Sequence, residues 1–168
     1  SCAAMLKLGK SQKCKILREK DFGVFVGNEG EEGVLLPIRQ VPKGKKVGDE
    51  ITVFVYKDSR DRLIATTRKP YMEVGEIAKL RVNDVNAIGA FMDIGLEKDI
   101  LLPHREMRYA LKKDMEEEVY LYIDKTERLA ASMYTKKKED ARHISQEEVN
   151  TSRYEKCAEQ IEHILEEK

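Results

Sequence analysis

The most informative stretch of this chain is FGVFVGNEGEEGVLLPIR, residues 22–39. It returns 66 residues later as IGAFMDIGLEKDILLPHR, residues 88–105. A repeat of this period indicates two copies of one structural unit, too few for a solenoid. We therefore expect two separate small domains, residues 6–70 and 71–136, followed by a segment of a different kind at 137–168.

The periodicity inside each unit is that of β-strands. Residues 51–56 (ITVFVY) and 119–123 (VYLYI) are β-branched and aromatic runs with alternation, a pattern typical of half-buried strands. Five short strands in about 65 residues predict a small closed β-barrel, because an open sheet of this size would leave exposed edges and little core. Residues 107–113 are expected to form a short helix between the third and fourth strands of the second unit. The other strands expected in the first unit, separated by Gly, Asn and Asp, are residues 13–17, 23–27, 33–36 and 63–67.

The segment 137–168 differs from the two units in composition and pattern. After a polar linker, SQEE at residues 145–148 fits a capping box and predicts the start of an α-helix. Such a helix either packs on a barrel or binds a partner or dimerises. The predicted fold class is all-β, two tandem five-stranded barrels with a C-terminal α-helical tail. The apolar stripe of the helix would consist of Tyr154, Ala158, Ile161 and Leu165.

Charge is unevenly placed along the 168 residues. The chain carries 31 Lys and Arg against 31 Asp and Glu, a balance that would ordinarily argue against nucleic acid. Residues 6–70, however, hold 15 cationic against 9 anionic side chains, whereas residues 71–136 hold 10 against 13. Phosphate affinity follows the local field, which decays over roughly 8 Å at physiological salt. The first unit can therefore attract nucleic acid inside a neutral chain.

Motifs for catalysis, metal binding and secretion are not found. The three cysteines, Cys2, Cys14 and Cys157, lack metal-site spacing, so we expect neither a zinc site nor a disulfide framework. The three histidines have no obvious catalytic partners, and no glycine-rich phosphate loop is present. No stretch approaches the ~20 apolar residues of a membrane span, and residues 1–4 are interpreted as a cloning remnant. We expect a cytoplasmic protein that is not an enzyme, has no cofactor and does not bind membranes.

The two units resemble the S1 RNA-binding domain, a member of the OB-fold class. The resemblance covers nearly all of residues 6–136. It rests on the Phe-Gly-x-Phe step at 22–25, GVLLP at 33–37, VGDE at 47–50 and the DSRDRL turn at 58–63. More narrowly, the chain looks like the N-terminal part of the conserved virulence factor B family, bacterial proteins with tandem S1 domains and a C-terminal winged-helix domain. That likeness is carried by KDFGVF at 20–25, LLP at 35–37 and DRLIATT at 61–67.

Two phenylalanines of the first unit are candidates for stacking against bases. Phe22 and Phe25 are three apart, which in a regular strand places them on opposite faces. A bulge at Gly23 would bring both rings to one face and turn Val24 and Val26 inward. Two exposed rings form a platform that contributes about 1–3 kcal/mol per base and is indifferent to sequence. The alternative is that the rings belong to the core.

The resemblance implies further contacts. In many S1 domains a histidine follows the Gly-Leu-Val segment; here Pro37 stands in that place, and in the second unit His104 follows a proline. The resemblance also implies that an Asp and an Arg line the binding face of each unit. The alternative for His104 is an exposed histidine without a ligand. The alternative for each Asp and Arg pair is an ordinary salt bridge within the turn. The loop lysines Lys43, Lys45 and Lys46 either attract phosphates or are merely solvated. The full predicted set is Phe22, Phe25, Pro37, Arg39, Lys43, Lys45, Lys46, Asp58, Arg62, Phe91, His104, Arg105, Asp124 and Arg128.

The leading functional prediction is a non-catalytic protein that binds single-stranded RNA through the face formed by the second and third strands of each barrel. Its expected role is in post-transcriptional regulation. Single-stranded DNA is an alternative ligand, because stacking does not read the 2′-hydroxyl. A second alternative is an adaptor that docks onto a transcription, translation or RNA-decay complex through the acidic second unit or the tail helix. We expect the first unit to dominate binding, because Ile88 replaces the first ring in the second unit.

Overall fold

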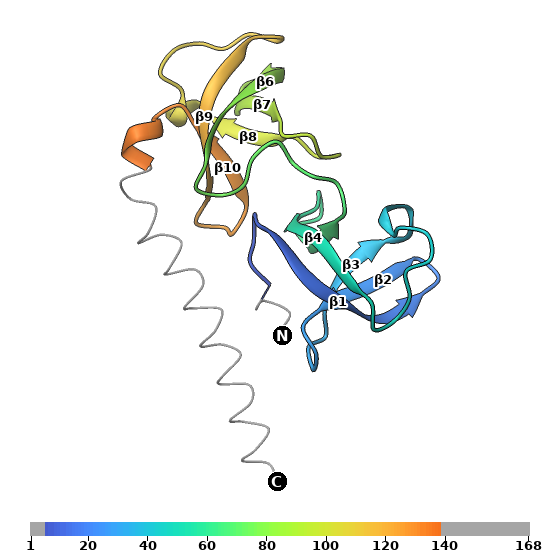
Figure 1. The fold of residues 1–168 in the computed structure, drawn as a ribbon. Helices are drawn as coiled ribbons and strands as arrows, with labels where there is room; N and C mark the ends of the chain where they lie inside the picture. The colour runs from blue at the N-terminus through green and yellow to red at the C-terminus, as the bar shows by residue number, and fades with distance from the viewer. Residues whose placement is uncertain (1–5, 139–168) are drawn as a thin grey trace.

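The computed structural model describes residues 6–138, which form two β-barrels joined by a short connection (Figure 1). Residues 135–138 are helical, so a short C-terminal helix is present where the sequence predicts the start of a linker. The predicted capping box and apolar stripe lie outside the described residues, so that part of the tail stays a prediction. No helix within residues 6–138 is long and apolar enough to cross a membrane.

The first barrel closes around five strands. Their hydrogen-bonded order is β1-β2-β3-β5-β4, and β4 pairs back onto β1. One parallel contact, between Leu35 of β3 and Ile64 of β5, completes the closure. The strands are β1 (Ser11–Lys20), β2 (Gly23–Gly27), β3 (Val34–Pro37), β4 (Glu50–Lys57) and β5 (Leu63–Thr66).

The second barrel repeats this topology, with a parallel contact between Leu101 of β8 and Ala130 of β10. The prediction of two tandem five-stranded barrels is therefore confirmed. All strands fall inside residues 6–70 and 71–136, which we retain as the proposed domain boundaries. The second set of strands is β6 (Ile77–Asn86), β7 (Gly89–Asp93), β8 (Ile100–Pro103), β9 (Glu116–Ile123) and β10 (Leu129–Ser132).

Strand alternation sends one face of each strand into a barrel core. Val24 and Val26 of β2 are 4% and 0% exposed, as predicted, and their counterparts Ala90 and Met92 in β7 are fully buried. Burial of this apolar surface contributes about 25 cal/mol per Å². The alternate side chains of the same strands face outward, and Phe25 and Phe91 are among them.

The short helix predicted at residues 107–113 is wrong. The helical turn lies earlier, in the 3-10 helix η3 (His104–Glu106), and the equivalent turn of the first barrel is η2 (Ile38–Gln40). Met107 then takes an extended conformation, and the chain crosses to β9 without helix. A seven-residue helix is unstable without packing. Here the extended path itself buries Leu111 in the core.

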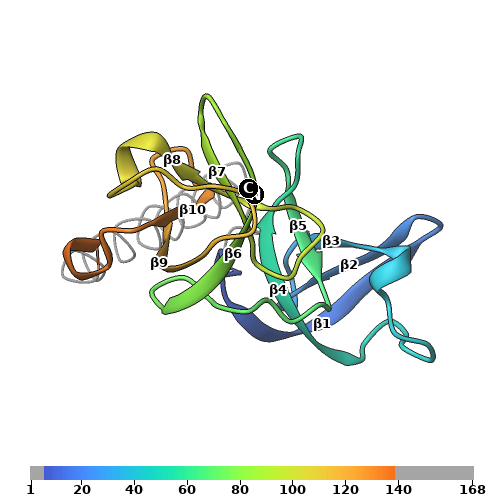
Figure 2. The ribbon, with the colours of Figure 1, turned by 90° about the horizontal axis from the view of Figure 1, so that it is seen from above.

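Strand β4 belongs to the cores of both barrels. Val53 and Val55 face the interior of the first barrel, whereas Phe54 and Tyr56 point the other way and pack in the apolar cluster of the second. Phe54 is only 1% exposed. Figure 2 shows β4 on the side of the first barrel that faces the second. Because one strand serves two cores, the barrels are held against each other.

Cys14 is expected to resist alkylation in the folded protein. Burial raises the pKa of its thiol from 9.0 to about 11, helped by the nearby Glu31 carboxylate. The thiolate is the nucleophile, and a shift of this size leaves roughly 100-fold less of it below pH 9. Iodoacetamide labelling at pH 8.5, followed by peptide mass spectrometry, should show Cys14 reacting at least about 50-fold more slowly in native than in guanidinium-unfolded protein.

The same thiol makes stability depend on pH. The folded-state pKa is raised, so the contribution of the neutral thiol is fully present below pH 9.0 and is lost as the pH rises toward about 11. Equal labelling rates in the folded and unfolded chain would contradict the buried position of Cys14.

Candidate nucleic-acid interface

The two phenylalanine rings of the first barrel lie together on its outer surface. Phe22 is 56% exposed and Phe25 is partly exposed, with ring centroids 6.2 Å apart and planes at 86°. Neither ring belongs to the core. An edge-to-face pair at the surface presents aromatic groups on which bases can stack.

The cause of this arrangement differs from the prediction. The register shift lies in β1, between Ile16 and Arg18, and not at Gly23. Phe22 reaches the same side as Phe25 because it sits in the turn before β2 rather than in the strand. Gly23 is required for another reason: its φ is +152°, and a Cβ there would lie 2.2 Å from the carbonyl oxygen of Leu36. The glycine permits the close approach of β2 to β3.

Arg18 is a third member of this surface that sequence reasoning missed. It pairs with Phe25 across β1 and β2, and its guanidinium carbon lies 4.1 Å from the centroid of the Phe25 ring. The same guanidinium donates to the carbonyl of Glu32, which fixes it over the ring. A guanidinium placed over an aromatic ring brings both a positive charge and a planar group to the surface. The strand register could have revealed it, but only with the β1 bulge in place.

The second barrel lacks both features at the matching positions. Asp84 stands where the first barrel has Arg18 and pairs with Phe91 in the same register. Ile88, 60% exposed, replaces the Phe22 ring. One carboxylate in place of a guanidinium changes the local charge by two units beside an otherwise equivalent phenylalanine.

The proline segments lie beside these surfaces. Pro37 pairs with Gly23 at the end of β3 and is partly exposed. In the second barrel His104 is exposed, and its Nε2 lies 3.1 Å from the carbonyl oxygen of Asn86. The ring is thus held against the turn that carries Ile88, and Arg105 is exposed on the same η3 turn.

The predicted Asp and Arg pairs differ between the barrels. Asp58 accepts from the backbone and side chain of Arg62, with an Nε to Oδ2 distance of 3.0 Å. Burial alone would raise the pKa of Asp58, but these hydrogen bonds outweigh it and hold the pKa below its ordinary value. The alternative of a turn salt bridge therefore describes the first barrel. In the second barrel, Asp124 accepts a hydrogen bond from the backbone N–H of Arg128 but not from its side chain. The side chain of Arg128 donates to Asp61 instead.

The loop lysines are exposed but are not brought to the ring pair. Among the described residues, no hydrogen bond, ion pair or cation–π contact joins them to Phe22 or Phe25. Lys45 donates its Nζ to the carbonyl of Glu50 at 2.9 Å. The loop is tied to β1 by a hydrogen bond from Gly48 to the carbonyl of Ile16. The three lysines, Lys43, Lys45 and Lys46, thus contribute to the field of this barrel without direct contact to the rings.

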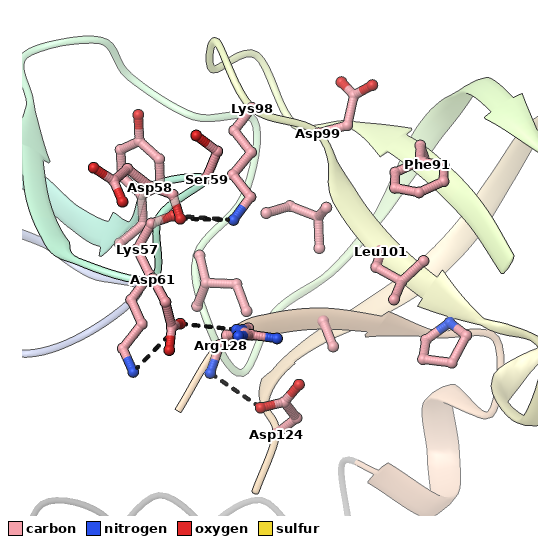
Figure 3. A pocket seen from close by; sticks show the side chains of 15 residues that line it. Lys57, Asp58, Ser59, Asp61, Phe91, Lys98, Asp99, Leu101, Asp124 and Arg128 are labelled. Atoms are coloured by element: carbon pink, nitrogen blue, oxygen red, sulfur yellow. Dashed lines mark hydrogen bonds and ion pairs between the residues drawn. The ribbon is translucent and has the colours of Figure 1, made fainter. Parts of the chain in front are cut away.

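A pocket of about 360 Å³ lies where the barrels meet (Figure 3). One wall is the β4–β5 turn of the first barrel, with Ser59 and Asp61, and the other is the outer face of the second barrel, with Phe91 and Leu101. Arg128 crosses this gap: its Nε donates to Oδ1 of Asp61 at 2.8 Å. The sequence could not have shown this contact, because the partners lie in different units.

The comparisons with known proteins agree with this geometry. A family model described as S1 domain matches twice, at residues 8–68 and 74–134. The chain is 34% identical over 98 residues to the uncharacterized protein YitL of Bacillus subtilis, covering 58% of this chain and 33% of that protein. Among solved structures it is similar to a multidomain protein with nucleic acid binding domains from Streptococcus pneumoniae, with a TM-score of 0.62 and 25% identity.

That second match covers 74% of this chain and 45% of the pneumococcal one. The chain therefore spans between a third and a half of the length of both relatives. The narrower likeness to the conserved virulence factor B family stays a resemblance. The S1 resemblance is confirmed, because the two family matches coincide with the two closed barrels. The chain belongs to the S1 domain family and carries two S1 domains in tandem.

Proposed function

We propose that this protein binds single-stranded nucleic acid, RNA above all, without catalysing a reaction on it. The observation that carries the proposal is the surface formed by Phe22, Phe25 and Arg18, with one exposed ring, one partly exposed ring and a guanidinium over the second. Stacking on aromatic rings and phosphate attraction by Arg are the two terms by which proteins hold single strands. The S1 family membership and the nucleic acid binding domains of the pneumococcal relative support the same function.

The first barrel is the main binding unit in this proposal. Its sequence carries an excess of six positive charges, and the arginine over Phe25 adds charge at the stacking surface itself. Asp84 at the matching position of the second barrel repels phosphates instead. The physiological role we assign is post-transcriptional regulation in the cytoplasm.

Binding should fall steeply as salt rises. Three or four phosphate contacts release counterions and predict that affinity for a fluorescein-labelled 12-nucleotide RNA drops about 20- to 50-fold between 50 and 200 mM salt. Fluorescence anisotropy measures this directly. A dissociation constant weaker than about 100 μM at the lower salt, the weak limit of non-specific binding, would refute the proposal.

The choice of RNA over DNA needs its own experiment. Competition between unlabelled RNA and DNA of matched sequence tests whether the 2′-hydroxyl is read. Stronger competition by RNA is the expected result. Equal competition would make the protein a general single-strand binder.

A further inference from the structure

Two arginines of the predicted contact set are held by carboxylates of the opposite barrel. Arg128 of the second barrel pairs with Asp61 of the first, and Arg39 of the first pairs through two nitrogens with Glu97 of the second. All four side chains are between 41% and 66% exposed. Exposed ion pairs contribute little to stability, so a phosphate can replace either carboxylate at small cost.

The pocket between the barrels has the chemistry of a nucleotide site. Phe91 and Leu101 supply an apolar wall, and Ser59 supplies a hydroxyl on the other side. The Nζ of Lys98 reaches across and donates to the carbonyl of Asp58 at 3.1 Å (Figure 3). A volume of about 360 Å³ lies within the range of small-ligand pockets.

The net charge of the pocket lining means that binding of a phosphate depends on Arg128. The lining carboxylates outnumber the lining cations by four to three. A hydrogen bond from Arg128 holds the pKa of Asp61 below its ordinary value, so Asp61 is ionised at neutral pH. An entering phosphate therefore meets net negative charge and needs a cation that turns toward it, which Arg128 supplies when it leaves Asp61. The charged lining residues are Lys57, Lys98, Arg128, Asp58, Asp61, Asp99 and Asp124.

A row of side chains leads from the ring pair of the first barrel to this pocket. Phe25 pairs with Leu35, and Leu35 pairs with Ile64. Ile64 in turn pairs with Tyr56, which lines the pocket. Three strand spacings amount to about 15 Å. Ile64 and Tyr56 pack in the apolar cluster of the second barrel, so the part of this row that is open to a strand ends near Leu35, about two strand spacings from Tyr56.

We infer that the pocket is a nucleotide-binding site built by both barrels, in which one unit of the single strand lies against Phe91 and its phosphate displaces Asp61 from Arg128. Asp61 is then an intramolecular competitor that lowers the affinity of the second barrel for the strand. The inference rests on the proposed function.

The test is the substitution Asp61→Asn with Asp114→Asn as its matched control. Asp61 and Asp114 both have positive φ, 62° and 73°, which asparagine tolerates. Each holds one exposed arginine, but the partner of Asp114 is Arg81, which does not line the pocket. In anisotropy titrations with the 12-nucleotide RNA we expect Asp61→Asn to bind about two- to fivefold more tightly. The slope of log affinity against log salt should stay as in the wild type, because Arg128 contacts the same phosphate in both complexes.

Asp114→Asn should leave both the affinity and the slope within error. Adding Arg128→Gln to Asp61→Asn should abolish the gain. Photocrosslinking of the wild-type protein with 4-thiouridine-containing RNA should label peptides around both Ser59 and Phe91.

Each outcome decides between the two claims. If wild type binds RNA but Asp61→Asn shows no gain over Asp114→Asn, or if crosslinks are confined to the first barrel, the shared site is refuted and the proposed function stands. If none of the four proteins binds the RNA, the proposed function itself fails.

Discussion

Replacing Phe25 with alanine is expected to weaken RNA binding by about 1–3 kcal/mol, or roughly 5- to 150-fold. The ring is the centre of the proposed surface, because it meets the Phe22 ring in a T-shaped arrangement and Arg18 lies over it. Removing it deletes one stacking partner and also leaves the guanidinium without its support. Anisotropy titration of the variant against the 12-nucleotide RNA measures the loss.

The internal repeat supplies the control for Phe25. Phe91 occupies the matching position, beside Asp84 instead of Arg18, so Phe91→Ala should cost clearly less affinity than Phe25→Ala. Phe25→Trp should retain stacking and would introduce the first tryptophan of this chain. Its fluorescence should be quenched when RNA binds. Equal losses for Phe25→Ala and Phe91→Ala would contradict the dominance of the first barrel, and an unchanged tryptophan signal would place the strand elsewhere.

The fold could be predicted because its signals are local. The repeat, the alternation of residues 51–56 and the glycine steps all report on neighbours along the chain, and strand periodicity decides which side chains face inward. Val24 and Val26 lie in the core as predicted, although the prediction relied on a bulge at Gly23 that the structure places in β1 instead. The helix at 107–113 was wrong because a short apolar run does not distinguish a helix from an extended path that buries one leucine.

The candidate site was only partly predictable because its contacts are not local. Arg18 lies over Phe25 because a bulge in β1 shifts the strand register between Ile16 and Arg18. No residue type in this strand predicts the bulge. The partner of Arg128 lies in the other repeat, at Asp61. Resemblance to the S1 family placed Arg128 on a binding face, but the packing of two barrels decides what holds it there.

Phe54→Ala is expected to destabilise the protein by about 3–5 kcal/mol, the largest effect on stability of any substitution proposed for this chain. Phe54 is 1% exposed and lies in the apolar cluster of the second barrel, although its strand belongs to the first. Its truncation would leave a cavity between the barrels that a closed sheet cannot collapse to fill. Urea unfolding followed by circular dichroism measures the change.

The same change at an exposed ring provides the comparison. Phe22→Ala should alter the free energy of unfolding by less than about 0.5 kcal/mol, since Phe22 is 56% exposed. Loss of the Phe54 ring should also loosen the pairing of Asp61 with Arg128, because the cluster around Phe54 and Tyr56 holds the barrels together. Phe54→Ala should therefore unfold in two separate transitions where the wild type unfolds in one. A loss below about 1 kcal/mol with a single transition would mean that the barrels do not share a core, and the site between them would then have no fixed geometry.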